Sequence, residues 1–497
     1  MNLLMKQGSL LEVTITDLNT GGEGVGRING KVIFVPDTVT GDRALVRLTR
    51  VKSKYAEGKL QKLLTSSSDR IRPRCIVADK CGGCQWQHIN WKHQLVTKRQ
   101  QVIQSLQRIG GLQEIQVQST LHTADDLHYR NKVTYPLGIS TTGNLQAGYY
   151  RKNSHKIVNL NQCPVQDSRL NPLLKEIKQD IQQQGWSIYD ETTNQGQTRA
   201  FPPFPHSRAS EGKPCSVGVP LRIENSAGSD RYRRRGVAPQ LRHLSLRIGY
   251  HTEEILVTLV ATNNKIPGLT EQAKIWIDRY PNLVGVCLNI NRDQTNIIFG
   301  HQTHTIVGKP YLKEIFGGLE FRILSDTFFQ VNTAAAELLL NKIIQLLNLQ
   351  GHEILVDAYC GIGTFTLPLA KKVKQAIGIE VHPASIIQAK QNAEINQITN
   401  VNFYTDKVEK YLQKINIVAD IILLDPPRQG CDRRVIETLL NLQPSKIVYV
   451  SCKPATLARD LKLLCSSGIY QPQLIQPIDF FPQTSHIESL VLLQRLR

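Results

Sequence analysis

Short alternations of apolar and polar residues fill the first 66 residues of the chain, and glycine-rich turns separate them. The alternating stretches cover residues 11–18, 31–37, 43–51 and 56–64. Strands that recur about every ten residues are typical of small all-β barrels. We therefore predict an OB-like β-barrel over residues 1–66.

A helical period follows the barrel. Between Trp91 and Ile109 the apolar residues recur at a spacing that gives one stripe, and the basic residues lie mostly off it. The stripe consists of Leu95, Val96, Val102, Ile103, Leu106 and Ile109, and the basic residues are Lys92, Lys98, Arg99 and Arg108. Strand-like patterns come next, between residues 131 and 160 and again between 243 and 262. These patterns predict an α+β central domain over residues 67–322.

One stretch inside this central domain loses every hydrophobic period. Residues from about 191 to 240 are rich in Pro, Gly, Ser and Arg, with a basic run at 231–235. A segment of this composition buries too little apolar surface to offset the entropy lost on ordering. We expect a disordered insertion that does not carry the function.

From about residue 323 the pattern changes to alternating apolar strands and helices. The expected strands lie at 353–359, 375–381, 400–404, 420–425, 446–452 and 487–495, and two of the helices lie at 334–347 and 385–396. Alternation of this kind gives a parallel, doubly wound sheet. We predict an α/β domain over residues 323–497.

Composition excludes several classes of protein. A chain of 497 residues is too long for one ordinary core, and 41% hydrophobic with 20% charged residues excludes wholesale disorder. No apolar run reaches the roughly 18 residues that span a bilayer, and the first residues lack the long apolar region of a signal peptide. We expect a soluble, cytoplasmic protein with no membrane partner.

The net charge of +19 points to an acidic partner. Nucleic acid is favoured over an anionic surface, because no amphipathic membrane helix is evident. Six basic residues gather late in the predicted barrel: Arg47, Arg50, Lys52, Lys54, Lys59 and Lys62. On composition alone they fit a solvated edge as well as an RNA-facing surface.

A turn of small residues, VDAYCGIGTF at 356–365, follows the first predicted strand of the α/β domain. Such a turn lets the backbone approach a ligand closely, and Glu380 at the end of the next strand suits ribose hydroxyls. The third glycine of the dinucleotide fingerprint is missing, which disfavours a pyrophosphate ligand. A nucleoside cofactor without phosphates, such as S-adenosylmethionine, fits better.

Three further residues are expected at the same edge of the sheet. Asp425 opens DPPRQG after one strand, and Cys452 ends the next strand in VSCKP, where the adjacent Lys453 favours a thiolate. Glu488 begins the last strand and shares their cleft if that strand runs antiparallel to its neighbours. Each residue alone also fits a structural role: a rigid turn, a buried thiol and an ordinary carboxylate.

Three cysteines lie apart from this site, in the pattern Cys75-x5-Cys81-Gly82-Gly83-Cys84. The two glycines let the backbone wrap closely around a ligand. Zinc sites usually show paired C-x2-C motifs, whereas three close thiolates and a distant fourth also suit a [4Fe–4S] cluster. The spacing alone leaves iron and zinc open.

In combination, DPPRQG, VSCKPATLARDL at 450–461 and HIESLVLL at 486–493 resemble the RNA (uracil-5-)-methyltransferase family. The resemblance is to its 23S rRNA branch in particular, which carries a TRAM domain and an iron–sulfur cluster. It covers nearly the whole chain apart from residues 191–240, and FFQVN at 328–332 also matches the family. It implies a Rossmann-like methyltransferase domain and a TRAM barrel at the N-terminus.

The resemblance also implies roles for individual residues. Cys452 is the implied nucleophile and Glu488 the implied base. The implied S-adenosylmethionine site consists of Gln330, Tyr359, Thr364, Glu380, Asp406 and Asp425, although relatives often carry Asn where Thr364 stands. The implied ligands of the [4Fe–4S] cluster are Cys75, Cys81, Cys84 and Cys163.

This set suits methylation of uracil at C5. The C5 carbon is a weak nucleophile until a thiolate adds to C6, and a base must later remove the C5 proton. We expect a monomeric enzyme that makes 5-methyluridine in 23S rRNA, with tRNA as the alternative substrate. A noncatalytic RNA-binding assembly factor is the rival from another class, but a pure binder needs neither Cys452 nor Glu488.

Overall fold

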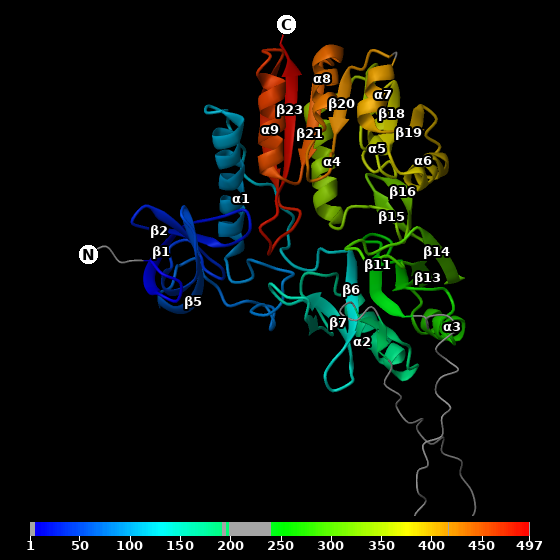
Figure 1. The fold of residues 1–497 in the computed structure, drawn as a ribbon. Coiled ribbons are helices and arrows are strands. Elements are labelled where there is room, and N and C mark those ends of the chain that lie inside the picture. Colours follow the sequence, from blue (N-terminus) through cyan, green and yellow to red (C-terminus); the bar gives the residue numbers. More distant parts are fainter. Residues whose placement is uncertain (1–4, 191–194, 198–239, 416, 497) are drawn as a thin grey trace, which may run out of the picture.

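The computed structural model describes residues 5–190, 195–197, 240–415 and 417–496 (Figure 1). The expected insertion at about 191–240 lies outside these residues except at 195–197 and 240. Gln195–Gln197 forms strand β10, which pairs with β9 (Ile188–Asp190). In the described part of the chain, every helix is too short or too polar to cross a membrane.

The N-terminal domain is a closed five-stranded barrel. Its strands, in the order β1-β2-β3-β5-β4, are β1 (Leu10–Leu18), β2 (Gly24–Ile28), β3 (Lys31–Val35), β5 (Tyr55–Thr65) and β4 (Arg43–Val51). Strand β2 was not expected, because its sequence GVGRI resembles a turn. Gly24 belongs there because a Cβ atom would lie 1.9 Å from the Thr38 hydroxyl oxygen. The glycine therefore permits a close approach inside the barrel.

The central domain is built on a nine-stranded sheet. Its main path runs β14 (Gln302–Gly308), β13 (Leu283–Ile290), β12 (Ile255–Ala261), β11 (Leu241–Ile248), β6 (Lys132–Ile139), β7 (Leu145–Tyr150) and β8 (Ile157–Asn159). Helices α2 (Leu170–Gln183) and α3 (Leu269–Arg279) share its apolar core. The hairpin β15 (Tyr311–Phe316) and β16 (Leu319–Leu324) leads onward to the α/β domain.

Helix α1 (Trp91–Ser105) lies between the barrel and the α/β domain, and a π-helical turn at Leu106–Gly110 extends it (Figure 1). The predicted stripe is wrong at two positions, since Val96 is 65% exposed and Ile109 is 42% exposed. Lys98, expected off the stripe, is fully buried instead. Polar side chains of this helix form hydrogen bonds and an ion pair with residues of other domains. A hydrophobic period does not predict such contacts, because it reports only apolar burial.

The C-terminal domain has a seven-stranded sheet in the order β19-β18-β17-β20-β21-β23-β22. The parallel strands are β17 (Ile354–Asp357), β18 (Gln375–Glu380), β19 (Val401–Thr405), β20 (Ile421–Leu424) and β21 (Lys446–Ser451). The helices are α4 (Thr333–Leu347), α5 (Thr366–Ala370), α6 (Pro383–Ile395), α7 (Val408–Lys414), α8 (Arg433–Leu442) and α9 (Pro454–Cys465). Strands β22 (Tyr470–Ile478) and β23 (Glu488–Arg495) complete the sheet, antiparallel to each other.

Candidate active site

The carboxyl ends of the parallel strands bring most of the predicted residues to one edge of the sheet. Asp357 and Glu380 end β17 and β18, while Asp406, Asp425 and Cys452 directly follow β19, β20 and β21. Open α/β sheets bind ligands outside this edge. Five loops thus supply polar groups to one region.

The last strand adds Glu488 to the same edge. Strand β23 is antiparallel to β21, and Ser451 pairs with Ser489. Cys452 follows the first of these residues and Glu488 precedes the second. The last strand is therefore antiparallel to its neighbour, as the prediction for Glu488 required. This pairing brings Cys452 and Glu488 to the same end of β21 and β23.

Cys452 lies in an environment that disfavours its thiolate. Burial, then the carboxylates of Glu488 and Asp425, raise the pKa of its thiol to about 11. Arg428, three residues beyond Asp425, opposes this shift. We expected the adjacent Lys453 to favour the thiolate, but its side chain is exposed. Arg428 is the cation that lowers the pKa of Cys452.

Three carboxyl groups at this edge of the sheet also have raised pKa values. Burial, with Asp425 adding, raises the pKa of Glu488 well above its usual range, and Arg428 opposes it. Burial and Asp357 raise the pKa of Asp425 to about 7. Burial raises the pKa of Asp357 itself to about 6. Carboxyl groups held this close in a poorly solvated place are suited to a cationic ligand.

The turn after β17 is shaped for close contact. Gly361 and Gly363 have φ values of +55° and +85°, and a Cβ on Gly363 would lie 3.0 Å from the Leu367 side chain. Asp357 accepts a hydrogen bond of 2.6 Å from the Thr366 hydroxyl, which fixes the turn from beneath. Glu380 accepts from the backbone N–H of Gly361 at 3.3 Å, so its carboxylate lies against the turn. A glycine turn beside a half-buried carboxylate fits a nucleoside with free ribose hydroxyls.

The remaining predicted cofactor residues lie around this turn or near it. Asp406 donates its backbone N–H to the Glu380 carbonyl at 3.2 Å, which puts the two side by side. Thr364 is buried in the turn, and Tyr359 is half-buried with its hydroxyl bonded to the Cys431 thiol. Gln330 is half-buried in the loop before α4, where its carbonyl accepts from the Asn131 side chain at 3.1 Å.

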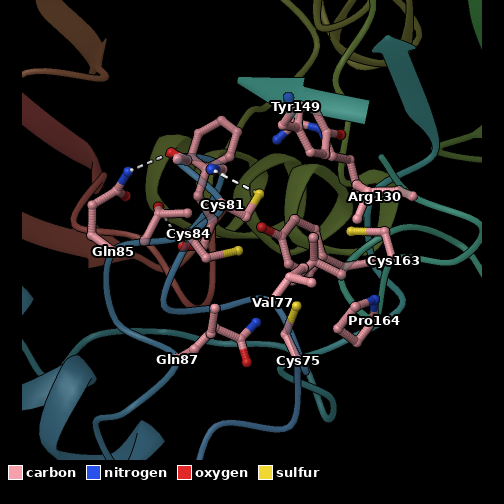
Figure 2. Close-up of a pocket in the computed structure, with 18 of the residues that line it drawn as sticks. Cys75, Val77, Cys81, Cys84, Gln85, Gln87, Arg130, Tyr149, Cys163 and Pro164 are labelled. Atoms are coloured by element: carbon pink, nitrogen blue, oxygen red, sulfur yellow. Dashed lines mark hydrogen bonds between the residues drawn. The ribbon is translucent and has the colours of Figure 1, made fainter. Parts of the chain in front are cut away.

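Four cysteines line one cavity in the central domain. The cavity of about 270 Å³ is walled by Cys75, Cys81, Cys84 and Cys163, and Figure 2 shows their sulfur atoms turned toward the same space. Burial, with the neighbouring thiols adding, raises the pKa of Cys84 to about 12. None of the four forms a disulfide. Among the described residues, no three His, Cys, Asp or Glu side chains form a group that could hold one metal ion.

The same cavity reaches the catalytic domain. Its wall also includes four residues of the α/β domain, Arg428, Phe481, Thr484 and His486. The positive charge of Arg428 also lowers the pKa of both Cys452 and Glu488. The cysteine cavity and the candidate active site therefore share a side chain.

Comparison with known proteins decides the family. A family model described as tRNA (uracil-5-)-methyltransferase matches residues 294–496, and a TRAM domain model matches residues 5–61. An RNA methyltransferase of Nostoc sp. is 57% identical over 98% of this chain and 96% of its own length. The chain belongs to the RNA (uracil-5-)-methyltransferase family. An RNA methyltransferase of Synechocystis sp. is 50% identical over 99% of this chain and 97% of its own.

A solved structure supports the same assignment. The tRNA (uracil-54, C5)-methyltransferase of Pyrococcus abyssi, in complex with S-adenosyl-L-homocysteine, superimposes with a TM-score of 0.71 at 26% identity. The match covers 97% of this chain and 100% of that one. The predicted fold, a Rossmann-like methyltransferase domain with an N-terminal TRAM barrel, is confirmed. This RNA (uracil-5-)-methyltransferase is an S-adenosylmethionine-dependent enzyme.

Sequence reasoning missed two residues of the site and one buried ion pair elsewhere in the fold. Asp357 lay inside a quoted motif but had no assigned role, although an acid at a strand end was signal enough. Arg428 was likewise visible in DPPR and was passed over for Lys453. The buried pair of Lys98 and Asp479 had no signal, because its members are distant in sequence.

Proposed function

We propose that this family member acts as a cytoplasmic monomer and converts a uridine of 23S rRNA to 5-methyluridine. Cys452 is the nucleophile and Glu488 the base. The observation that carries this proposal is the pairing of Ser451 with Ser489, which brings the thiol and the carboxylate to one end of a strand pair. A thiol, a base and a cofactor edge in one place are what C5 methylation requires.

The chemistry divides between these two side chains. The Cys452 thiolate forms a bond to C6, and the C5=C6 electron pair moves toward C5 and the O4 carbonyl. S-adenosylmethionine would supply the methyl group: its S–CH3 bond breaks as the C5–CH3 bond forms, the electron pair stays on sulfur, and S-adenosylhomocysteine is the leaving group. The Glu488 carboxylate then accepts the C5 proton, the C–H electrons restore the C5=C6 bond, and the C6–S bond breaks to release the thiolate. No oxidant or reductant is consumed.

The raised carboxyl pKa values suit this sequence. A sulfonium beside Asp425 favours the ionised form of that carboxyl and of its neighbours, because an opposite charge stabilises a buried carboxylate. The base and the thiol are thereby biased toward their reactive forms when the cofactor is present. We assign cofactor binding to Gln330, Tyr359, Thr364, Glu380, Asp406 and Asp425.

We assign a [4Fe–4S] cluster to the cysteine cavity, with Cys75, Cys81, Cys84 and Cys163 as ligands. Four thiols around one cavity supply the donor set of such a cluster. The backbone N–H of Gly83 donates to the Cys81 sulfur at 3.4 Å, a contact that stabilises a thiolate ligand.

The choice of 23S rRNA rests on the combination of a TRAM domain with the four-cysteine cavity, which is the pattern of the 23S rRNA branch. tRNA is the second candidate substrate. It is favoured by the likeness to the Pyrococcus abyssi enzyme, which acts on uracil 54 of tRNA and matches this chain over almost its whole length. RNA shape decides between them.

Mass-spectrometric mapping of modified nucleotides tests the substrate. In RNA from a strain that lacks this protein, we expect a 23S rRNA uridine to lose its methyl group while the tRNA is unchanged. Purified enzyme should restore that methyl group on unmodified 23S rRNA in vitro. Loss of 5-methyluridine from tRNA alone would establish the alternative, and no loss from either RNA would contradict the proposal.

A further inference from the structure

The connection between β22 and β23, residues 479–487, leads directly into Glu488. Its described partners come largely from the first third of the chain. They are Trp86, Trp91, Gln94 and Lys98, together with Thr20 in the barrel and Asp126 and Tyr129 in the central domain. The connection is therefore held largely by elements outside the domain that binds the cofactor, while inside that domain Asn332 donates to the Phe480 carbonyl at 3.1 Å and Phe480 packs in the apolar core.

The strongest of these contacts is an ion pair between Lys98 and Asp479. The Lys98 ammonium lies 2.6 Å from the Asp479 carboxylate, and both side chains are 0% exposed. Lys98 also donates to the Phe481 carbonyl at 3.0 Å, and the Trp91 indole N–H donates to the second Asp479 oxygen at 3.0 Å. The cost of removing two charges from water offsets most of the attraction between them, so a buried ion pair adds little net stability. The role of this pair is therefore better explained by the position that it gives to the connection.

A second clamp lies further along the connection. The Gln94 amide donates to the Gln483 side-chain oxygen at 3.3 Å, and the Gln483 backbone N–H donates to the Gln94 oxygen at 3.0 Å. Trp86, two residues after Cys84, donates its backbone N–H to the Gln483 carbonyl at 3.0 Å. Helix α1 and the cysteine loop therefore hold the connection at two points before Glu488.

We propose that Lys98 is a positioning residue for Glu488: its ion pair with Asp479 holds the connection so that the carboxylate meets the C5 proton. This inference rests on the proposed function of Glu488. A carboxylate displaced by about 1 Å loses of the order of 10²-fold in rate, so a distant pair can control the elimination step. Thiolate addition and methyl transfer use groups on other loops and proceed without this pair.

The test replaces the pair as a unit, with Lys98→Met and Asp479→Leu in the full-length protein. Removing one partner would leave a buried charge uncompensated and lower stability strongly, whereas exchanging both for apolar residues of similar size is often tolerated. Asp479→Asn is a second variant, because it keeps the shape and the hydrogen-bond acceptor but removes the charge. Thermal unfolding verifies that each variant is folded.

The decisive readout is the partition between released product and covalent adduct. We expect the double variant to lose turnover by about 10²-fold and to accumulate a methylated protein–RNA adduct that survives denaturing electrophoresis. Its affinity for S-adenosylmethionine should be unchanged. Asp479→Asn should shift the partition in the same direction by a smaller factor.

Arg70→Met combined with Asp42→Leu is the matched control, since it exchanges as a unit another ion pair, that of Arg70, 17% exposed, with the buried Asp42, 2.5 Å away in the barrel. It should lower stability without enriching the adduct. A double variant with the wild-type partition would overturn the positioning role, even if its turnover fell. Glu488→Gln, measured in parallel, separates the two claims: if it too forms no adduct, the proposed function fails, and if it alone forms one, only the inference about Lys98 fails.

Discussion

Ser451 of β21 pairs with Ser489 of β23 in an antiparallel ladder, and this pair fixes the candidate active site. Cys452 leaves the sheet after Ser451, and Glu488 enters it before Ser489. A parallel final strand would have put Glu488 at the opposite edge, away from the thiol. The antiparallel strand therefore brings together the two residues that we propose act on one uracil ring.

The first prediction concerns the pH dependence of the rate. Cys452 must be a thiolate and Glu488 a carboxylate, and the pKa values of both are raised, that of Cys452 to about 11. Each reactive form is therefore the deprotonated one, and its population grows with pH. We expect the single-turnover rate to rise through the neutral and mildly alkaline range, by about tenfold per unit where one group controls it. A flat or falling profile would contradict the assigned roles.

The second prediction distinguishes Arg428 from Lys453. Arg428 lowers the pKa of Cys452, so Arg428→Met should raise that pKa further and displace the pH–rate profile to higher pH. Lys453→Met removes an exposed cation of similar size and should leave the profile in place. The alkylation rate of Cys452 by a small thiol reagent, followed against pH, measures the shift directly. Equal shifts of the pH–rate profile in both variants would show that local net charge, rather than Arg428 in particular, lowers the pKa of Cys452.

The third prediction is that replacing Asp425 raises the stability of the protein and lowers its activity. Its pKa is about 7 in the folded protein against about 3.9 for an unfolded chain, so the folded state holds the proton more tightly. Its contribution to stability is therefore present at low pH and is lost between about pH 4 and pH 7. Asp425→Asn should raise the melting temperature at pH 8 through a gain of a few kcal/mol at most, with little change at pH 4.

A matched control for that measurement is Asp432→Asn. Asp432 is exposed, and the adjacent Arg434 lowers its pKa to about 2, the opposite direction from Asp425. This variant should not become more stable at pH 8. Turnover of Asp425→Asn should fall, because the substitution removes a proposed cofactor contact. A melting temperature that drops in Asp425→Asn at pH 8 would show that the carboxylate is stabilised in the free protein.

The fourth prediction concerns the cysteine cavity. Protein purified without oxygen should be brown and contain about four irons per chain, as a [4Fe–4S] cluster gives. Cys84→Ser should lose that iron and unfold at a lower temperature, because the ligands join distant parts of the chain. Cys465→Ser, which alters a half-buried thiol outside the cavity, should keep it. One zinc per chain without iron would refute the cluster.

Local patterns predicted much of the fold. The strand ends at Glu380, Asp425 and Cys452 follow from apolar runs and from the rule that ligands bind at the carboxyl edge of parallel strands. Strands β2 and β22 were among those that escaped prediction, since one is glycine-rich and the other is interrupted by Pro472 and Pro477. A strand is stabilised by the strands that pair with it, and its own sequence does not reveal which strands those are.

Contacts between domains were beyond the reach of the sequence. Lys98 sits among the basic residues of an amphipathic helix, and nothing beside it indicates a partner near residue 479. Three of the cysteines show the complementary case, because the spacing of Cys75, Cys81 and Cys84 indicates a metal site by itself; Cys163, which lines the same cavity, was implied only by the family resemblance. Residue chemistry is readable locally, whereas the partner of a buried charge depends on how the domains assemble.

The most direct test of the mechanism separates its two residues. Glu488→Gln keeps the shape of the side chain but lacks the basic carboxylate, so thiolate addition and methyl transfer should proceed while elimination stalls. Cys452→Ala should bind RNA and S-adenosylmethionine without transferring the methyl group. The measurement is denaturing electrophoresis of protein incubated with RNA and methyl-labelled cofactor. We predict a labelled protein–RNA adduct in Glu488→Gln that disappears when Cys452 is also replaced; near-normal turnover by Glu488→Gln, or an adduct that persists in the double variant, would contradict the account.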